Sequence, residues 1–246
     1  MTKVHTLILS LLFFVVNIAY SAPIRIGIDK YDPPFVYSIN SKTFYGFDVD
    51  MMTFLCKEMN RECQFVPLTF DQLLPFVQSK TVDMAASSIF ITPERARFIN
   101  FSIPYLLSYT QFLGKKALAD KPFSLDLLHN KRFGYERGTL IPLVIKSLGI
   151  INPQLVAFNN NNEVVDAITK GTVDFGLFTE NSAIYWESNS GDQLTLVGKP
   201  IPFGLGVGIA VNKDEVQLLN DLNKALLNFQ NSDEFKKTYN KYISHF

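Results

Sequence analysis

Helix-like and strand-like segments alternate along this sequence, and that alternation is the feature that most limits its possible folds. Apolar residues near helical spacing mark residues 47–60 and 70–79 as helices, and short apolar runs mark residues 24–28, 64–68 and 82–86 as strands. A repeated strand, helix, strand order builds sheets of mainly parallel strands with helices packed on them. The sequence therefore predicts an α/β architecture.

The alternation contains an internal repeat. An apolar helix, a short turn, the tripeptide Thr-Val-Asp and a buried strand occupy residues 73–86, and the same order returns at residues 164–177. Two helix-turn-strand units can look alike by chance, and two copies are too few for a solenoid. Because one copy lies in each half of the chain, we interpret the repeat as two lobes of similar structure.

Two segments are candidates for the connections between these lobes. Residues 108–114 form a strand-like stretch, and residues 203–211 resemble a strand with alternating glycines. The glycine spacing does not match a nucleotide-binding loop, so backbone bending or close approach explains it better. We expect one lobe from residues 22–109 with 205–246 and the other from residues 110–204, joined by a two-stranded hinge.

The first 21 residues have the three parts of a secretory signal peptide. Lys3 supplies the charged start, residues 7–16 form a short apolar run, and small residues lead to a cut after Ser21. A membrane anchor is the alternative, but it needs about 20 apolar residues. Because no cysteine lies near the cut, we expect export without a lipid anchor.

The charge balance argues against nucleic acid as a partner. The chain has 23 Lys and Arg residues and 23 Asp and Glu residues, whereas nucleic-acid binders carry a marked basic excess. After the N-terminal run, no stretch is apolar for long enough to span a bilayer. These features predict a soluble exported protein whose partner is a small molecule.

The sequence has two cysteines, Cys56 and Cys63. In an exported protein a close pair of this kind indicates a disulfide. Metal binding is the alternative, but two ligands with no histidine between them make a poor site, and His129 and His245 are isolated in sequence. We therefore predict a disulfide, no metal and no cofactor.

Candidate binding residues follow from a general rule for open α/β sheets. Ligands bind at the carboxyl ends of the strands, close to the N-termini of helices. The rule selects positions in both halves of the chain, as a cleft between two lobes requires. They are Asp29, Phe65, Ser87 and Ser88 in the first half, and Glu136, Thr139, Thr179 and Glu180 in the second.

Several motifs occur in an order that is specific to one family. Gly-Phe-Asp-Val-Asp at residues 46–50 precedes Ser-Ser-Ile at 87–89, Ile-Thr-Pro-Glu-Arg at 91–95 and Gly-Thr at 138–139. With these motifs the chain resembles the family 3 periplasmic solute-binding proteins of polar-amino-acid ABC transporters, such as the lysine/arginine/ornithine- and glutamine-binding proteins. The resemblance implies a two-lobed periplasmic-binding-protein fold (type II), a monomer in the periplasm, an amino-acid ligand and an inner-membrane ABC permease as partner.

The resemblance also assigns roles to individual residues. Arg95 matches an arginine that grips the ligand α-carboxylate, and a guanidinium group fits a carboxylate through two parallel hydrogen bonds. Asp29 matches an acid that contacts the ligand side chain, and Phe65 matches an aromatic that packs on the ligand. Ser88 and Thr139 match positions that offer hydroxyls or amides to the head group. Without the resemblance, Arg95 would be interpreted as a solvated charge, Asp29 as a turn residue and Phe65 as a core aromatic. Ser88 and Thr139 would be interpreted as capping residues.

Three positions depart from the family pattern and leave the ligand open. Asp32 replaces an aromatic that stacks on the ligand, for which the neighbouring Tyr31 is a substitute. Phe90 replaces a Thr or Ser that contacts the head group. Thr179 replaces an Asp that pairs with the ligand ammonium, and a shift of one residue would bring in Glu180, although such a shift reverses a strand side chain.

The sequence is compatible with two classes of function, a transport protein and an enzyme. The acids Asp29, Asp32 and Glu136 favour a transport protein for a cationic amino acid such as arginine, lysine or ornithine. The alternative is an enzyme similar to the periplasmic cyclohexadienyl dehydratases, in which an acid such as Glu180 acts as general acid. No catalytic motif is clear in the sequence. We predict a binding protein and not an enzyme, while signalling without transport gives the same sequence pattern.

Overall fold

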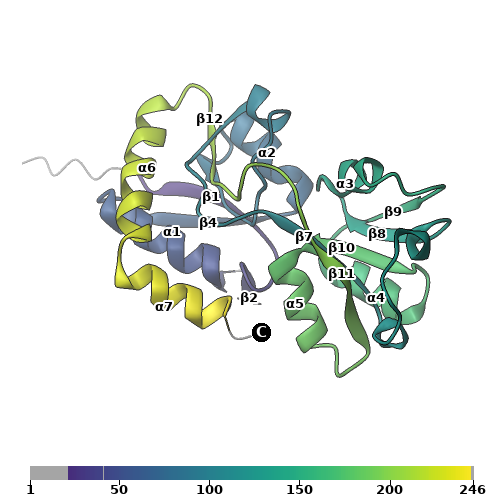
Figure 1. Ribbon diagram of the computed structural model, residues 1–246. Helices are drawn as coiled ribbons and strands as arrows, with labels where there is room; N and C mark the ends of the chain where they lie inside the picture. Colours follow the sequence, from purple (N-terminus) through teal and green to yellow (C-terminus); the bar gives the residue numbers. More distant parts are fainter. Residues whose placement is uncertain (1–21, 41, 245–246) are drawn as a thin grey trace, which may run out of the picture.

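The computed structural model describes residues 22–40 and 42–244. The predicted signal peptide and His245 therefore lie outside the described residues. Within the described residues, no helix is both long enough and apolar enough to cross a membrane. The chain forms two α/β lobes, each built on its own sheet (Figure 1), so the predicted fold class is confirmed.

The first lobe is built on a sheet with the strand order β4-β1-β5-β12-β6. β1 pairs in parallel with β4 and β5, whereas β12 is antiparallel to β5 and β6. Side chains of α1, α6 and α7 share one buried core with this sheet, and α2 packs in another. The strands are β1 (Ile24–Asp29), β4 (Cys63–Leu68), β5 (Met84–Ala85), β6 (Ile99–Phe101) and β12 (Ala210–Asn212), and the helices are α1 (Phe47–Glu58), α2 (Phe70–Gln78), α6 (Val216–Gln230) and α7 (Asp233–Tyr242).

The second lobe is built on a sheet with the order β11-β7-β10-β8-β9. Its core has one part with α3 and another with α4 and α5. The strands are β7 (Tyr109–Lys115), β8 (Arg132–Glu136), β9 (Gln154–Phe158), β10 (Phe175–Thr179) and β11 (Leu194–Pro202), and the helices are α3 (Ile141–Ser147), α4 (Asn161–Lys170) and α5 (Glu180–Ser188). A separate hairpin of β2 (Tyr37–Asn40) and β3 (Thr43–Tyr45) belongs to the first half of the chain.

The Thr-Val-Asp repeat forms equivalent structures in the two lobes. Asp83 precedes β5 and pairs with Arg25 of β1 at 2.7 Å, while Asp174 precedes β10 and pairs with Arg132 of β8 at 2.8 Å. The backbone amides of both arginines donate to the same carboxylates. In each lobe the aspartate therefore joins the turn after a helix to the start of a neighbouring parallel strand.

The predicted strand over residues 203–211 is wrong for most of its length. Only its last residues belong to β12, and Val207 forms isolated bridges to Phe90 and Leu106. Gly206 has a φ of 112°, and a Cβ atom there would lie 2.6 Å from Cβ of Pro104. The glycine thus allows the close approach that its spacing indicated.

The chain passes between the two sheets twice, once from β6 to β7 and once from β11 to β12. The bridge between Leu106 and Val207 joins these two crossings. They provide the structural basis for a hinge, while the division of the chain at residues 109 and 205 stays a prediction.

The predicted disulfide between Cys56 and Cys63 is confirmed. It joins α1 to the first residue of β4, so it holds a helix of the first lobe against the edge strand of its sheet.

Removing this disulfide with the double substitution Cys56→Ala and Cys63→Ala should destabilise the protein. The cysteines are seven residues apart in sequence, and the chain-entropy model gives such a short loop ~2–3 kcal/mol of stabilisation. Urea unfolding of the oxidised wild type and the double variant measures this difference. Equal stability of the two proteins, or two alkylated cysteines in non-reduced wild type, would contradict the prediction.

Candidate functional site

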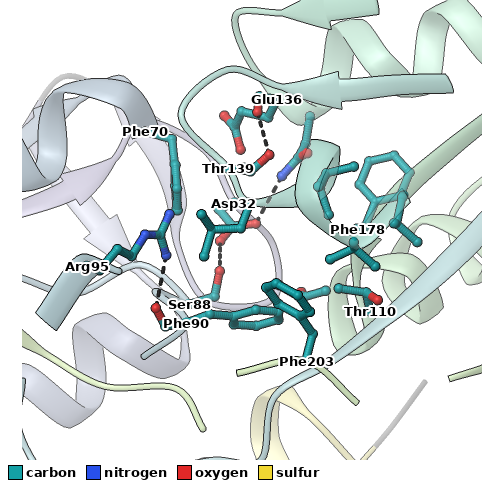
Figure 2. Close-up of a pocket in the computed structure, with 16 residues that line it drawn as sticks. Asp32, Phe70, Ser88, Phe90, Arg95, Thr110, Glu136, Thr139, Phe178 and Phe203 are labelled. Atoms are coloured by element: carbon teal, nitrogen blue, oxygen red, sulfur yellow. Dashed lines mark hydrogen bonds between the residues drawn. The ribbon is translucent and has the colours of Figure 1, made fainter. Parts of the chain in front are cut away.

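A small cavity of about 40 Å³ lies between the lobes (Figure 2). Its wall includes residues that follow β8 and β9 and the last residues of β10, in agreement with the strand-end rule. Seven of the predicted site residues line it: Asp32, Ser88, Phe90, Arg95, Glu136, Thr139 and Thr179.

The other four predicted site residues do not line this cavity. Asp29 is buried at the end of β1, and its amide donates to the hydroxyl of Ser87 at 3.1 Å. Phe65 packs against the core of the first lobe, and Glu180 is the partly buried first residue of α5. The proposed roles of all eleven residues in ligand binding stay predictions.

Among the described residues that line the cavity, Arg95 is the one with a guanidinium group. Arg95 is 6% exposed, and its Nη atoms donate to the carbonyl oxygen of Phe90 at 3.0 Å (Figure 2) and to that of Gly138 at 3.1 Å. The ring of Phe70 lies 5.7 Å from the guanidinium carbon. Burial lowers the pKa of Arg95 to about 10, so the side chain still carries its charge at neutral pH.

Local sequence explains how Arg95 is aimed at the cavity. It begins the short 3₁₀ turn Arg95–Arg97, and its amide donates to Oγ1 of the buried Thr92 at 3.3 Å. Within the described residues, no carboxylate lies within ion-pairing distance of its guanidinium. A buried cation without an anionic partner is costly, so this part of the cavity is suited to bind an anion.

Asp32 links the two lobes across the cavity. Its carboxylate accepts hydrogen bonds from Ser88 of the first lobe at 2.7 Å and from two groups of the second lobe, Ser182 at 3.2 Å and Asn161 at 3.3 Å. Burial raises the pKa of Asp32 to about 6, although these three donors favour the ionised form. The side chain of Asp32 therefore holds the lobes together and also carries charge at the cavity wall at neutral pH.

Asp29 and Glu136 form a second contact between the lobes. Their side chains are 2% and 3% exposed, and they lie within hydrogen-bonding reach of each other. Burial, followed by the charge of Asp32, raises the pKa of Asp29 to about 7. Burial and the charge of Asp29 raise the pKa of Glu136 well above its usual range. Three buried carboxyl groups therefore converge here, which suits a positively charged partner.

The hydroxyl groups at the cavity have structural partners. Thr179 is the N-cap of α5, where its hydroxyl accepts from the amide of Ser182 at 3.3 Å and donates to the hydroxyl of that residue at 2.9 Å. Thr139 donates to the backbone carbonyl of Glu136 at 2.6 Å. These contacts are the capping and turn interactions expected without any ligand.

Several cavity residues were not found by sequence reasoning. Asn161 is the first residue of α4, directly after β9, so the strand-end rule could have identified it. Phe203 lies on a crossing between the lobes, and its position depends on how they meet. Tyr31, considered as a substitute stacking residue, instead packs near Tyr37 and Trp186. The remaining cavity residues outside the prediction are Phe70, Thr110, Leu140, Ile141, Val144, Leu177 and Phe178.

Comparison with known proteins gives consistent matches over nearly the whole chain. The arginine-binding periplasmic protein of Mannheimia haemolytica is 30% identical over 241 residues, which cover 96% of this chain and 97% of that protein. The crystal structure of an arginine 3rd transport system periplasmic binding protein from Legionella pneumophila has a TM-score of 0.84 and 30% identity, covering 90% of this chain and all of that one.

A third match bears on the enzyme alternative. The crystal structure of the ancestral amino acid-binding protein AncCDT-1, described as a precursor of cyclohexadienyl dehydratase, has a TM-score of 0.81 and 28% identity, covering 90% of this chain and 95% of that one. The model of one family, the bacterial extracellular solute-binding proteins, family 3, matches residues 24–245. The lobes, the cleft between them and this matched span agree, and the chain belongs to the bacterial extracellular solute-binding proteins of family 3.

Proposed function

We propose that this protein captures a cationic amino acid of the arginine, lysine or ornithine type and delivers it to an ABC permease in the inner membrane. The observation that carries the proposal is the unpaired guanidinium of Arg95 in the same cavity as buried carboxyl groups. An amino acid with a cationic side chain has one carboxylate and two positive groups. Its charges are complementary to those of the cavity.

Arg95 is the proposed anchor for the ligand α-carboxylate. Two of its donors already point to carbonyl oxygens, one in each lobe, and a guanidinium group has five N–H donors in a planar fork. A carboxylate bound to the remaining donors would neutralise a charge that the protein has removed from water. The contact to Gly138 also brings the second lobe to the anchor.

The buried acids are the proposed site for the positive groups of the ligand. Asp32 and Glu136 line the cavity, and Asp29 lies within reach of Glu136. A cation placed among them would offset the desolvation that raises the pKa values of these three groups. The names of arginine-binding relatives support the same ligand class.

The remaining predictions concern location and assembly. We propose a periplasmic protein that is exported by its signal peptide, carries no lipid anchor and acts as a monomer. Relatives named as periplasmic binding proteins support the location. We also propose lobes of residues 22–109 with 205–246 and of residues 110–204, which close on the ligand about the two crossings.

A dehydratase activity is the less favoured alternative. The likeness to AncCDT-1 covers the fold and most of the sequence, but a general acid must reach the substrate. Glu180, the acid considered for this role, does not line the cavity. Glu180 in this position therefore gives no support to a dehydratase activity.

Substituting Arg95→Ala should strongly weaken the binding of L-arginine. Removing one partner of a buried ion pair leaves the other charge desolvated and typically costs ~2–5 kcal/mol, which at ~1.4 kcal/mol per decade is roughly 30-fold to several thousandfold in Kd. Calorimetric titration measures this change. Arg97→Ala is the matched control, because Arg97 lies two residues away and is exposed. Wild-type affinity in Arg95→Ala would rule out the proposed anchor.

Ligand binding should close the lobes. At about pH 8, saturating L-arginine should reduce the radius of gyration measured by small-angle scattering. The fluorescence of Trp186, the single tryptophan of the chain, provides a second readout, because its ring in α5 lies 6.3 Å from that of Tyr31 in the first lobe. L-glutamate, with the opposite side-chain charge, is the control ligand. An unchanged scattering profile and unchanged emission at saturation would count against closure.

A further inference from the structure

Three buried carboxyl oxygens of the described residues lack a hydrogen-bond donor, and two of them face each other from different lobes, while the third is Oδ1 of Asp48. The two that face each other are Oδ2 of Asp29, at the end of β1, and Oε1 of Glu136, at the end of β8. Two carboxylates cannot donate to each other, so an ionised pair would leave both desolvated charges unsatisfied and repelling. One proton on the pair provides a donor and removes one of the charges.

Within the described residues, no cationic side chain forms an ion pair with Asp29 or Glu136. The backbone amide of Tyr31 donates to Oδ1 of Asp29 at 2.9 Å, which leaves the other oxygen unsatisfied. Asp32 and Asp71 add negative charge, and Lys30 acts on Asp29 only through its longer-range charge. Arg95 lies on the same cavity wall as Glu136, but its guanidinium donates to the carbonyl oxygens of Phe90 and Gly138.

We propose that Asp29 and Glu136 hold one shared proton when the cleft is closed and empty, and that the positive side chain of the ligand replaces this proton. In the empty cleft, protonated Glu136 donates to the carboxylate of Asp29 and joins the lobes. When a cationic side chain enters, Glu136 loses its proton to the solvent, and the two carboxylates face the ligand cation instead. The second step rests on the proposed function, whereas the first step does not depend on any ligand.

The proton makes closure of the empty protein depend on pH. In the open protein both carboxyl groups are exposed to water and have ordinary pKa values near 4. In the closed form the pKa of Asp29 is raised to about 7 and that of Glu136 still further, mainly by burial. Groups whose pKa is raised by closure stabilise the closed form at low pH, and this stabilisation is lost as the pH rises through the raised values.

The first test uses the ligand-free protein. Small-angle scattering between about pH 5 and about pH 9 should show a radius of gyration that increases with pH in the wild type. Glu136→Gln and Asp29→Asn each replace the shared proton by an amide donor, so either variant should show a much smaller change of radius over this range, and the buried Asp32 contributes to the change that remains. Asp221→Asn is the control, because Asp221 is an exposed acid of α6. A wild-type radius that does not change with pH, or variants that keep the same dependence, would overturn the proposal.

The second test follows the proton during binding. Calorimetric titration with L-arginine in two buffers of different ionisation enthalpy should show release of about one proton at about pH 6 and much less at about pH 9. L-citrulline, which has a neutral group in place of the guanidinium, should bind without this release, and Glu136→Gln should abolish it for L-arginine. Tight arginine binding without proton release would overturn the replacement of the proton by the ligand, but not the shared proton of the empty cleft. Absence of arginine binding would refute the proposed ligand, while the scattering result would still decide whether the pair holds a proton.

Discussion

The cleft contains a buried cation and a group of buried acids, and the cation forms no ion pair with any of these acids. Arg95 is almost completely removed from water, yet its guanidinium donates to the carbonyl oxygens of Phe90 and Gly138 and not to a carboxylate. Asp29 and Glu136 each have a buried oxygen without a donor. Burying a charge without its partner is unfavourable, and in a binding protein that cost can be offset by the ligand. The arrangement therefore defines the charges of the molecule that fits.

The rest of the fold brings these groups together. Asp29 is the last residue of β1 and Glu136 is the last residue of β8, so the pair exists only because the carboxyl ends of strands from two separate sheets face each other. At the other end of the same two strands, the ion pairs of Asp83 and Asp174 hold the starts of β1 and β8 in place. Two crossings join the lobes, and Gly206 of the β11 to β12 crossing packs closely on Pro104 and Leu106 of the other crossing. Rigid lobes with a narrow connection are the architecture expected for closure on a ligand.

The sequence was sufficient to predict what depends on local pattern. Residue spacing identified the alternating elements, the repeat and the disulfide, and the strand-end rule placed Glu136 and Thr179 at the cavity. Prediction from the sequence failed where the structure depends on contacts between distant segments. Residues 203–209 alternate like a strand, but positive φ values at Gly204 and Gly206 and close contacts with Pro104 and Ile91 prevent regular pairing. The Asp29–Glu136 contact could not be predicted, because it depends on how the lobes meet.

The orientation of a bound ligand tests the central claim most directly. A crystal structure of the complex with L-arginine measures it. The account predicts that the α-carboxylate accepts hydrogen bonds from Arg95, while the ligand guanidinium lies among Asp29, Asp32 and Glu136. A ligand bound in the reverse direction, or bound outside this cavity, would contradict the account.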